Sequence, residues 1–332
     1  MKNQTYGVEI ETTALGREKA ARVIARVLGD GSLVRHIGGT YDEWRVTAPD
    51  GRDWSCKSDA SITGHRRYDN SGPDAEVITP ILGGTPDRYA QDMETLCAII
   101  RALREAGAKC DDSCGVHVHI GLGQHTPRTL RNLVNIVYAK EDFLREALGI
   151  SEDRLTWWCQ QVEPAFLAAM NQEKPKDLDD LAMLWYGHVG RTYGRGGDSR
   201  LLNRALDPHE RALRLSSHKH NHYDDSRYRL LNLHAVWQKG TVEFRAFNGV
   251  LHAGKIRAYV LLCLAISDKA LKSASARPAK NLSENHAYAF RCWLLQLGFI
   301  GDEFAAPRKH LMENVPGNGA WRHGNPTQRA TA

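Results

Sequence analysis

Residues Val8-Glu9-Ile10-Glu11 alternate apolar and acidic side chains near the start of the chain. Because positions i and i+2 of a β-strand share a face, this stretch predicts a strand that buries Val8 and Ile10 and directs both glutamates to the other side. Two later stretches repeat the pattern with other ionisable residues: Val116-His117-Val118-His119-Ile120 and Val242-Glu243-Phe244-Arg245. Together they predict a sheet with one apolar face and one face that carries carboxylates, imidazoles and an arginine.

The ionisable face requires compensating charge. Unpaired charges buried in a protein cost several kcal/mol each, so carboxylates that converge on a cleft need cations beside them. Four carboxylates interrupt apolar, strand-like segments: Glu9, Glu11, Glu76 and Glu243. Carboxylate oxygens are hard ligands that suit Mg²⁺ or Mn²⁺. We therefore predict a divalent metal site, to which Asp59 is a candidate fifth carboxylate unless Lys57-Ser58-Asp59 is a solvated turn.

A zinc site is the main alternative for the histidines. His117 and His119 share a face, and Cys110 and Cys114 precede them. Structural zinc sites favour closer cysteine pairs, and Cys114-Gly115 before a strand is equally typical of a turn. The spacing therefore argues against zinc. The other histidines that we considered are interpreted as solvated or locally hydrogen-bonded: His125, His218, His220 and His222.

Arg245 lies one pleat from Glu243 and is predicted to be the main anion ligand. A guanidinium held by carboxylates can bind phosphate through two hydrogen bonds, although an internal ion pair with Glu243 would explain the pattern as well. Four more basic residues are supplementary phosphate candidates, for which surface charge is the simpler interpretation: Arg227, Arg229, Lys239 and Lys255. No Walker-type or Rossmann-type glycine motif accompanies them, so a bound nucleotide must be held by metal and arginine.

The composition of the 332 residues, with 42% hydrophobic and 25% charged, is ordinary for a globular enzyme. The formal net charge of +5 is mild and spread along the chain, which argues against nucleic-acid binding. No apolar run approaches the roughly 18 residues of a membrane helix, and the N-terminus does not read as a signal segment, so we expect a cytoplasmic protein. The seven cysteines are scattered and imply no disulfide framework.

The order of the expected elements follows from hydrophobic periodicity. The first part predicts a strand ending near Thr12, a helix Arg17–Leu28, a hairpin of Trp44–Val46 and Trp54–Lys57 turning at Pro49-Asp50-Gly51, a strand from Ala75 to Pro80 and a helix Asp87–Ala106. A helical insertion follows, with helices Leu130–Leu148, Ser151–Met170 and Leu178–Tyr186 and a lid-like loop Gly187–Arg200. The last part predicts a hairpin of Arg227–Trp237 and Thr241–Phe247, in which Asn232 and His234 share a strand face. Helices Lys255–Leu271 and Glu284–Leu297 and a frayed tail from Pro316 follow.

Five short motifs, taken in their order and spacing, resemble the amidoligase family. That family belongs to the carboxylate-amine ligases related to glutamine synthetase and glutamate-cysteine ligase. The resemblance covers roughly residues 6 to 265 and rests on these segments: Gly7-Val8-Glu9-Ile10-Glu11, Asp59-Ala60-Ser61-Ile62, Glu76-Val77-Ile78-Thr79-Pro80-Ile81-Leu82, Cys114-Gly115-Val116-His117-Val118-His119 and Val242-Glu243-Phe244-Arg245.

The resemblance implies an α+β fold with a curved antiparallel sheet and helices on its outer face, as in the catalytic domain of glutamine synthetase. Residues 1–270 would form the catalytic domain, including the helical insertion at about 127–215, and residues 271–332 a C-terminal helical extension and flexible tail. The insertion has no counterpart that we assign in the larger relatives.

The resemblance also implies an ATP site on the inner face, where two or three Mg²⁺ or Mn²⁺ ions join carboxylates to the phosphates. Arg245 would contact the transferring phosphate. The resemblance leaves the general base for the amine unassigned, and Asp59 is a candidate because a carboxylate near a metal-bound phosphate could accept the ammonium proton. The implied reaction is γ-phosphoryl transfer to a substrate carboxylate, followed by attack of an amine on the acyl phosphate. Whether the substrates are a small amino acid and amine or a peptide or protein stays open. The implied metal ligands are Glu9, Glu11, Asp59, Glu76, Glu243 and either His117 or His119.

Two other classes of function fit parts of the pattern. Histidines and carboxylates also build the two-metal sites of hydrolases and phosphoesterases, which would use water alone as the acceptor. A basic nucleic-acid or protein-binding module with a structural metal would bind in a salt-dependent way without turnover. Inward-facing glutamates argue against the latter because they repel phosphate backbones.

Overall fold

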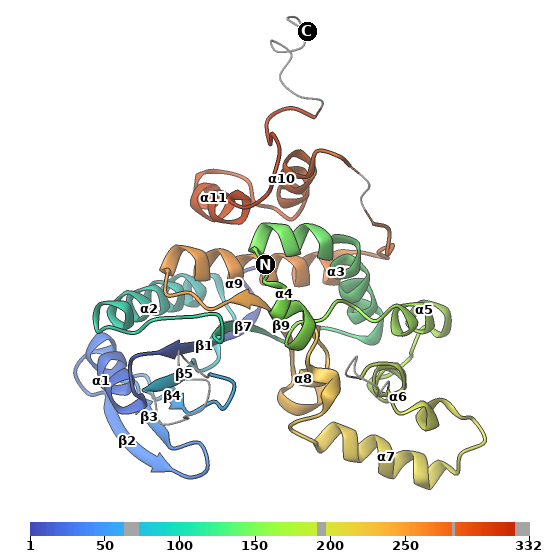
Figure 1. Cartoon of the computed structure of the whole chain (residues 1–332), viewed down its shortest axis with the longest axis horizontal. Coiled ribbons are helices and arrows are strands. Elements are labelled where there is room, and N and C mark those ends of the chain that lie inside the picture. Colours follow the sequence, from blue (N-terminus) through green and yellow to red (C-terminus); the bar gives the residue numbers. More distant parts are fainter. Residues whose placement is uncertain (63–72, 191–196, 281–282, 323–332) are drawn as a thin grey trace, which may run out of the picture. The chain divides into compact units, whose positions relative to one another are not determined.

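The computed structural model describes residues 1–62, 73–190, 197–280 and 283–322 of the chain. Within these residues, nine strands form one open antiparallel sheet, accompanied by eleven α-helices (Figure 1). This confirms the expected α+β fold class with an antiparallel sheet. The strands are β1 (Thr5–Thr13), β2 (Leu33–Gly38), β3 (Glu43–Thr47), β4 (Asp53–Lys57), β5 (Asp74–Ile78), β6 (Leu82–Gly83), β7 (Gly115–Gly121), β8 (Leu231–Asn232) and β9 (Thr241–Asn248).

The chain divides into two compact units. The first comprises Met1–Gly123 with Phe244–Leu264, and the second comprises Gln124–Glu243 with Ala265–Ala332. The strand order is β2-β3-β4-β5-β1-β7-β9-β8, and β6 pairs with β1 outside this path. The α-helices are α1 (Arg17–Leu28), α2 (Pro86–Glu105), α3 (Pro127–Leu148), α4 (Glu152–Trp157), α5 (Pro164–Glu173), α6 (Leu178–His188), α7 (Pro208–His220), α8 (His234–Lys239), α9 (Ala253–Lys272), α10 (His286–Gln296) and α11 (Ala305–Met312).

In the first unit, helices α1 and α2 pack on the apolar side of the sheet. They bury Ile24 of α1 and Leu96 and Ile100 of α2, which recur at helical spacing. The N-terminus of α2 is defined by Thr85, whose side chain accepts a hydrogen bond from the backbone N–H of Arg88, with proline at the first helical position. The opposite side of the sheet is therefore left for polar side chains.

The sequence predicted the elements of the first unit closely. The helix α1 has the expected bounds, α2 differs by one residue at each end, and β3 and β4 form the expected antiparallel hairpin. The two-residue alternation of these strands is unambiguous, because each buries one apolar face. Strand β2 was not predicted, since its side chains are mostly exposed and its sequence therefore lacks that alternation.

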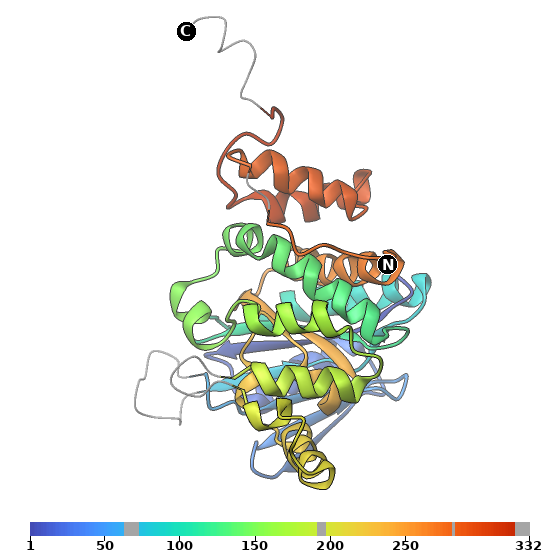
Figure 2. The same ribbon diagram turned by 90° about the vertical axis from the view of Figure 1, so that its right-hand side faces the viewer.

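In the second unit, helices α3, α5, α6 and α7 pack in succession (Figures 1 and 2). The prediction of one helix over Ser151–Met170 is wrong, because the segment forms the two helices α4 and α5. Pro164 cannot continue a helix and instead occupies the first position of α5. Between the two helices, the backbone of Gln160 hydrogen-bonds to Tyr228 and Leu230.

The predicted strand Arg227–Trp237 is also largely wrong. Only Leu231–Asn232 is a strand, and α8 follows at once. The side-chain oxygen of Asn232 accepts a hydrogen bond of 2.8 Å from the backbone N–H of His234, the first residue of α8, and this local bond competes with strand pairing. Asn232 and His234 therefore do not share a strand face, whereas β8 and β9 are neighbours in the sheet as expected.

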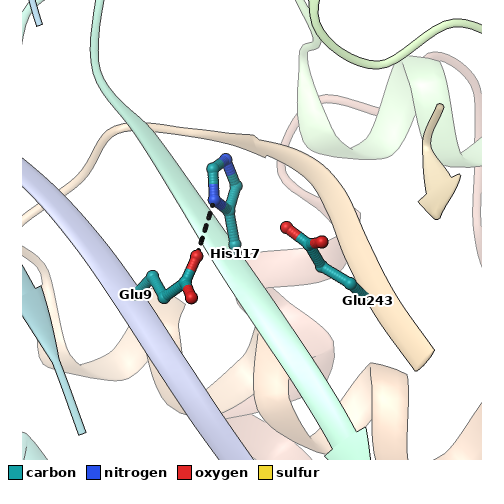
Figure 3. Close-up of side chains that lie close together, drawn as sticks. All are labelled: Glu9, His117 and Glu243. Atoms are coloured by element: carbon teal, nitrogen blue, oxygen red, sulfur yellow. Dashed lines mark hydrogen bonds and ion pairs between the residues drawn. The ribbon is translucent and has the colours of Figure 1, made fainter. Parts of the chain in front are cut away.

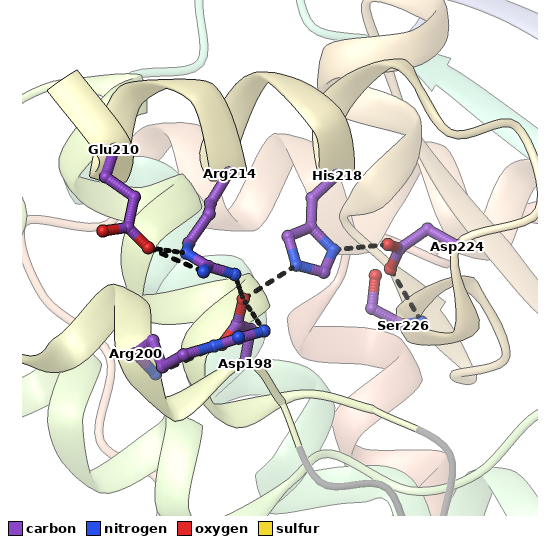
Figure 4. Close-up of polar contacts among 7 residues, drawn as sticks. All are labelled: Asp198, Arg200, Glu210, Arg214, His218, Asp224 and Ser226. Atoms are coloured by element: carbon purple, nitrogen blue, oxygen red, sulfur yellow. Dashed lines mark hydrogen bonds and ion pairs between the residues drawn. The ribbon is translucent and has the colours of Figure 1, made fainter.

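Polar contacts join several residues of the second unit around His218 of α7 (Figure 4). His218 Nδ1 lies 2.7 Å from Asp224 Oδ2, and His218 Nε2 lies 3.8 Å from Asp198 Oδ2. The ring of Tyr186 stacks on that of His218 with 5.1 Å between centroids. The lid-like loop expected at Gly187–Arg200 falls partly outside the described residues, at 191–196.

The carboxylate of Asp92 supports β6, the short strand that pairs with β1. Its carboxylate is 2% exposed and accepts hydrogen bonds from the backbone N–H of Gly83 (2.9 Å) and from Arg52 Nη2 (2.6 Å). We expect Asp92→Ala to lower the free energy of unfolding by about 2 kcal/mol, because it leaves a buried donor unsatisfied. Urea unfolding measures this. Asp30→Ala, an exposed control, should change little, and equal effects of the two variants would contradict this role.

His218 should make stability depend on pH. The hydrogen bond to Asp224 raises the pKa of His218 above its usual value, against the opposing effect of burial. Its stabilisation is therefore complete below the unfolded-state pKa of about 6.5 and is lost as pH rises through the folded-state pKa. We expect His218→Gln to lower the melting temperature more at about pH 6 than at about pH 8.5. The exposed His209→Gln on the same helix should show no such difference, and a larger loss at high pH would refute the assignment.

Candidate metal centre

Strand register brings the predicted ionisable residues together on the polar face of the sheet. In β1, Glu11 lies opposite Glu76 of β5, and Glu9 lies opposite His117 of β7. His119 lies opposite Gly7, one pleat further along. Directly opposite residues of antiparallel strands have Cβ atoms about 4.5–5.5 Å apart on the same face. Three neighbouring strands thus contribute carboxylates and imidazoles to one patch.

These side chains are buried and close to one another. The exposed fractions are 9% for Glu9, 3% for Glu11, 4% for His117 and 6% for His119. Glu9 lies between the imidazoles, with Oε2 3.2 Å from His117 Nδ1 and Oε1 3.2 Å from His119 Nε2. The other nitrogen of His117, Nε2, lies 3.9 Å from Glu11 Oε1. Because these groups are buried and close together, the electrostatic interactions between them are stronger than they would be in water.

Backbone hydrogen bonds fix the glutamate-bearing strand. The backbone N–H of Gly115 donates to Glu11 Oε2 at 2.5 Å, at the start of β7. The hydroxyl of Thr79 accepts from the backbone N–H of Val8, and the backbone N–H of Thr79 donates to the carbonyl of Val8. Sequence reasoning did not identify these supports. The Cys114-Gly115 turn was the one signal that pointed to the first of them.

Among the residues that the structure describes, two groups of side chains have the composition and spacing of a metal site. One ligand atom each from Glu11, Glu76 and His117 lies within 4.8 Å of the others, and the same holds for Glu9, His117 and Glu243 (Figure 3). Carboxylate oxygens predominate in both groups, with one imidazole nitrogen in each. This donor set fits a hard divalent cation such as Mg²⁺ or Mn²⁺, and a cation would offset the cost of burying the carboxylates.

Strand β9 carries Glu243 and Arg245, which are 3% and 5% exposed. Asn232 Nδ2 donates a hydrogen bond of 2.6 Å to Glu243 Oε2, and this bond fixes the orientation of the carboxylate. The sequence placed Asn232 near β9 but gave no indication that its side chain contacts Glu243. β9 is the neighbour of β7 in the sheet.

The remaining predicted site residues are not members of these two groups. Asp59 is half-buried after β4, and its Oδ1 accepts a 2.7 Å hydrogen bond from the backbone N–H of Ser61. Arg229 is buried and donates to the carbonyls of Gln161 (2.9 Å) and Gly190 (2.7 Å). Burial lowers the pKa of its guanidinium, with Glu163 opposing the shift. Lys255 is half-buried in the first turn of α9.

The cysteines considered for zinc lie beside the patch without joining either group. Cys110 Sγ donates to the carbonyl of Glu11 at 3.4 Å, and Cys114 Sγ lies 3.7 Å from Asp111 Oδ1. Hydrogen bonding to Cys114, together with burial, raises the pKa of the Cys110 thiol well above its usual value. Both groups consist of carboxylates and an imidazole, so their composition favours oxygen-rich ligation.

The described helices contain no segment long and apolar enough to cross a bilayer. A search of curated proteins found no match. The sequence model of the family described as Putative amidoligase enzyme matches residues 2–267, which include every strand of the sheet and both side-chain groups. Because the match covers most of the chain, this protein belongs to the Putative amidoligase enzyme family.

Proposed function

We propose that this protein is an ATP-dependent carboxylate-amine ligase that forms an amide or isopeptide bond through an acyl phosphate. The observation that carries the proposal is the cluster of buried Glu11 and His117 with half-buried Glu76 in a chain of the amidoligase family. Family membership supports a ligase, which joins a carboxylate to an amine. The carboxylate-rich cluster supports the use of divalent metal ions. Such ions neutralise the phosphate charge of a nucleoside triphosphate, which supports the use of ATP.

The residues of the patch divide into two tasks. His117 belongs to both groups and would ligate one divalent ion, either with Glu11 and Glu76 or with Glu9 and Glu243. His119 is a further candidate ligand. When bound, such ions neutralise the charge that accumulates on phosphoryl oxygens. Arg245, buried on β9, would bind the transferring phosphoryl group through its guanidinium.

The proposed reaction has two chemical steps. A carboxylate oxygen of the first substrate attacks the γ-phosphorus of ATP, the bond to the β–γ bridging oxygen breaks, and ADP leaves. The amine of the second substrate then attacks the carbonyl carbon of the acyl phosphate, phosphate leaves with the electrons of the broken C–O bond, and an amide remains. The amine's proton passes to a base, for which Asp59 is the candidate on the first unit.

The proposed substrates are one compound with a carboxylate and one with an amine. The carboxylate donor and the amine acceptor are either small amino acids and amines or groups on a peptide or protein. Arg229 and Lys255 would be supplementary nucleotide ligands, although the bonds of Arg229 to two backbone carbonyls favour a structural role for its side chain.

ADP release provides the test. With ATP and Mg²⁺, we expect ADP to form only when a pool of carboxylates is present, and faster when a pool of amines is added. Glu76→Gln should reduce the rate by at least about 100-fold, because it removes a metal ligand and its charge. The charge-matched variant Glu105→Gln, exposed at the end of α2, should retain wild-type activity.

Two outcomes would contradict the proposal. ADP formation that is independent of any carboxylate would indicate a hydrolase that transfers the phosphoryl group to water. Equal activity of folded Glu76→Gln and wild-type protein would remove the cluster from the reaction. If free metabolites give no turnover, the same assay is repeated with candidate proteins as substrates.

A further inference from the structure

A lysine continues the row of ionisable residues beyond the metal centre. Lys57 of β4 lies opposite Glu76 of β5, and Glu76 lies opposite Glu11 of β1. The three side chains therefore project from the same face of three consecutive strands. Neighbouring strands are about 4.8 Å apart, and the lysine ammonium sits on a flexible four-carbon stem, so it can reach over the neighbouring carboxylate.

Lys57 is held only weakly by its own surroundings. Its side chain is 32% exposed, and its Nζ lies 3.7 Å from Glu43 Oε2, which is longer than a hydrogen bond. Glu43 is bound more closely by Arg45, whose Nε and Nη2 donate to Oε1 at 3.0 Å and 2.9 Å. The charge of Glu43 is thus largely matched by Arg45. The ammonium of Lys57 retains capacity to bind another anion.

The charges on this face of the sheet indicate an anion-binding role for Lys57. Glu9, Glu11 and Glu76 are acidic, and the proposed reaction brings a triphosphate and a second carboxylate to them. Arg45 is bound to Glu43 and lies 3.7 Å from Asp53. Lys57 is therefore the cation of β3 and β4 that stands next to the carboxylate cluster and is available for an incoming ligand.

We infer that Lys57 binds an oxyanion held at the metal centre, either the transferring phosphoryl group or the carboxylate of the substrate. This inference rests on the proposed function. Both anions present oxygens that an ammonium recognises by charge, with one to three hydrogen bonds. The competing explanation is that Lys57 only neutralises Glu43 and Glu76, in which case its removal would change stability and leave anion binding unaltered.

The test measures anion binding directly, without turnover. Full-length protein is loaded with Mn²⁺, whose binding is followed by electron paramagnetic resonance. Inorganic phosphate and ¹³C-acetate are titrated separately, and the paramagnetic relaxation of their ³¹P and ¹³C nuclei gives the dissociation constant of each. Wild type is compared with Lys57→Met, Lys57→Arg and Lys109→Met, the last removing an exposed lysine before β7. Lys57→Gln replaces the methionine variant if that variant does not fold.

We expect Lys57→Met to bind one of the two anions about tenfold more weakly than wild type, with unchanged affinity for Mn²⁺. This loss is typical of removing a hydrogen bond to a charged group. The anion affinities of Lys57→Arg should stay within about threefold of the wild-type values, and those of Lys109→Met should equal the wild-type values. A loss confined to phosphate assigns Lys57 to the phosphoryl group, and a loss confined to acetate assigns it to the substrate carboxylate.

Unchanged affinities for both anions in Lys57→Met that still binds Mn²⁺ would overturn the inference and leave the proposed function intact. Absence of Mn²⁺ binding by the wild-type protein would overturn the metal centre and the inference together. The Mn²⁺ signal thus separates the two failures.

Discussion

The structure depends on the burial of two glutamates on one face of a central strand. Glu9 and Glu11 are nearly inaccessible to solvent, and the register of β1 with its neighbours brings Glu76 and His117 beside them. Carboxylates in such surroundings are costly unless cations compensate them. The proposed divalent ions would supply this compensation.

Much of this arrangement follows from a period of two. The alternation in Val8-Glu9-Ile10-Glu11 gave the strand, its buried face and its polar face from sequence alone, and the α+β class was confirmed. The errors arose where a single side chain changed the local backbone. Pro164 opens a new helix within one expected helix. The backbone N–H of His234 donates a hydrogen bond to the side chain of Asn232 where the expected strand ends and α8 begins. Periodicity cannot detect such local bonds.

The site was less accessible to sequence reasoning than the strands that carry it. The two-residue alternation of a strand determines which of its residues share a face. Which residues lie opposite one another on neighbouring strands depends on the register, and packing between distant segments sets the register. The pairs Glu11–Glu76 and Glu9–His117 were therefore visible only in the structure. The same holds for Asn232 against Glu243 and for Lys57 beside Glu76, because neither residue has a distinctive sequence context.

The central claim is that the glutamate-histidine face binds divalent metal, and a Mn²⁺ binding isotherm tests it most directly. Free Mn²⁺ is counted by electron paramagnetic resonance during titration of the wild-type protein, Glu11→Gln and the exposed control Glu105→Gln. We expect saturable binding by wild type and control, and affinity at least about tenfold weaker in Glu11→Gln, because a charged ligand is lost. Equal affinity in all three folded proteins would contradict it.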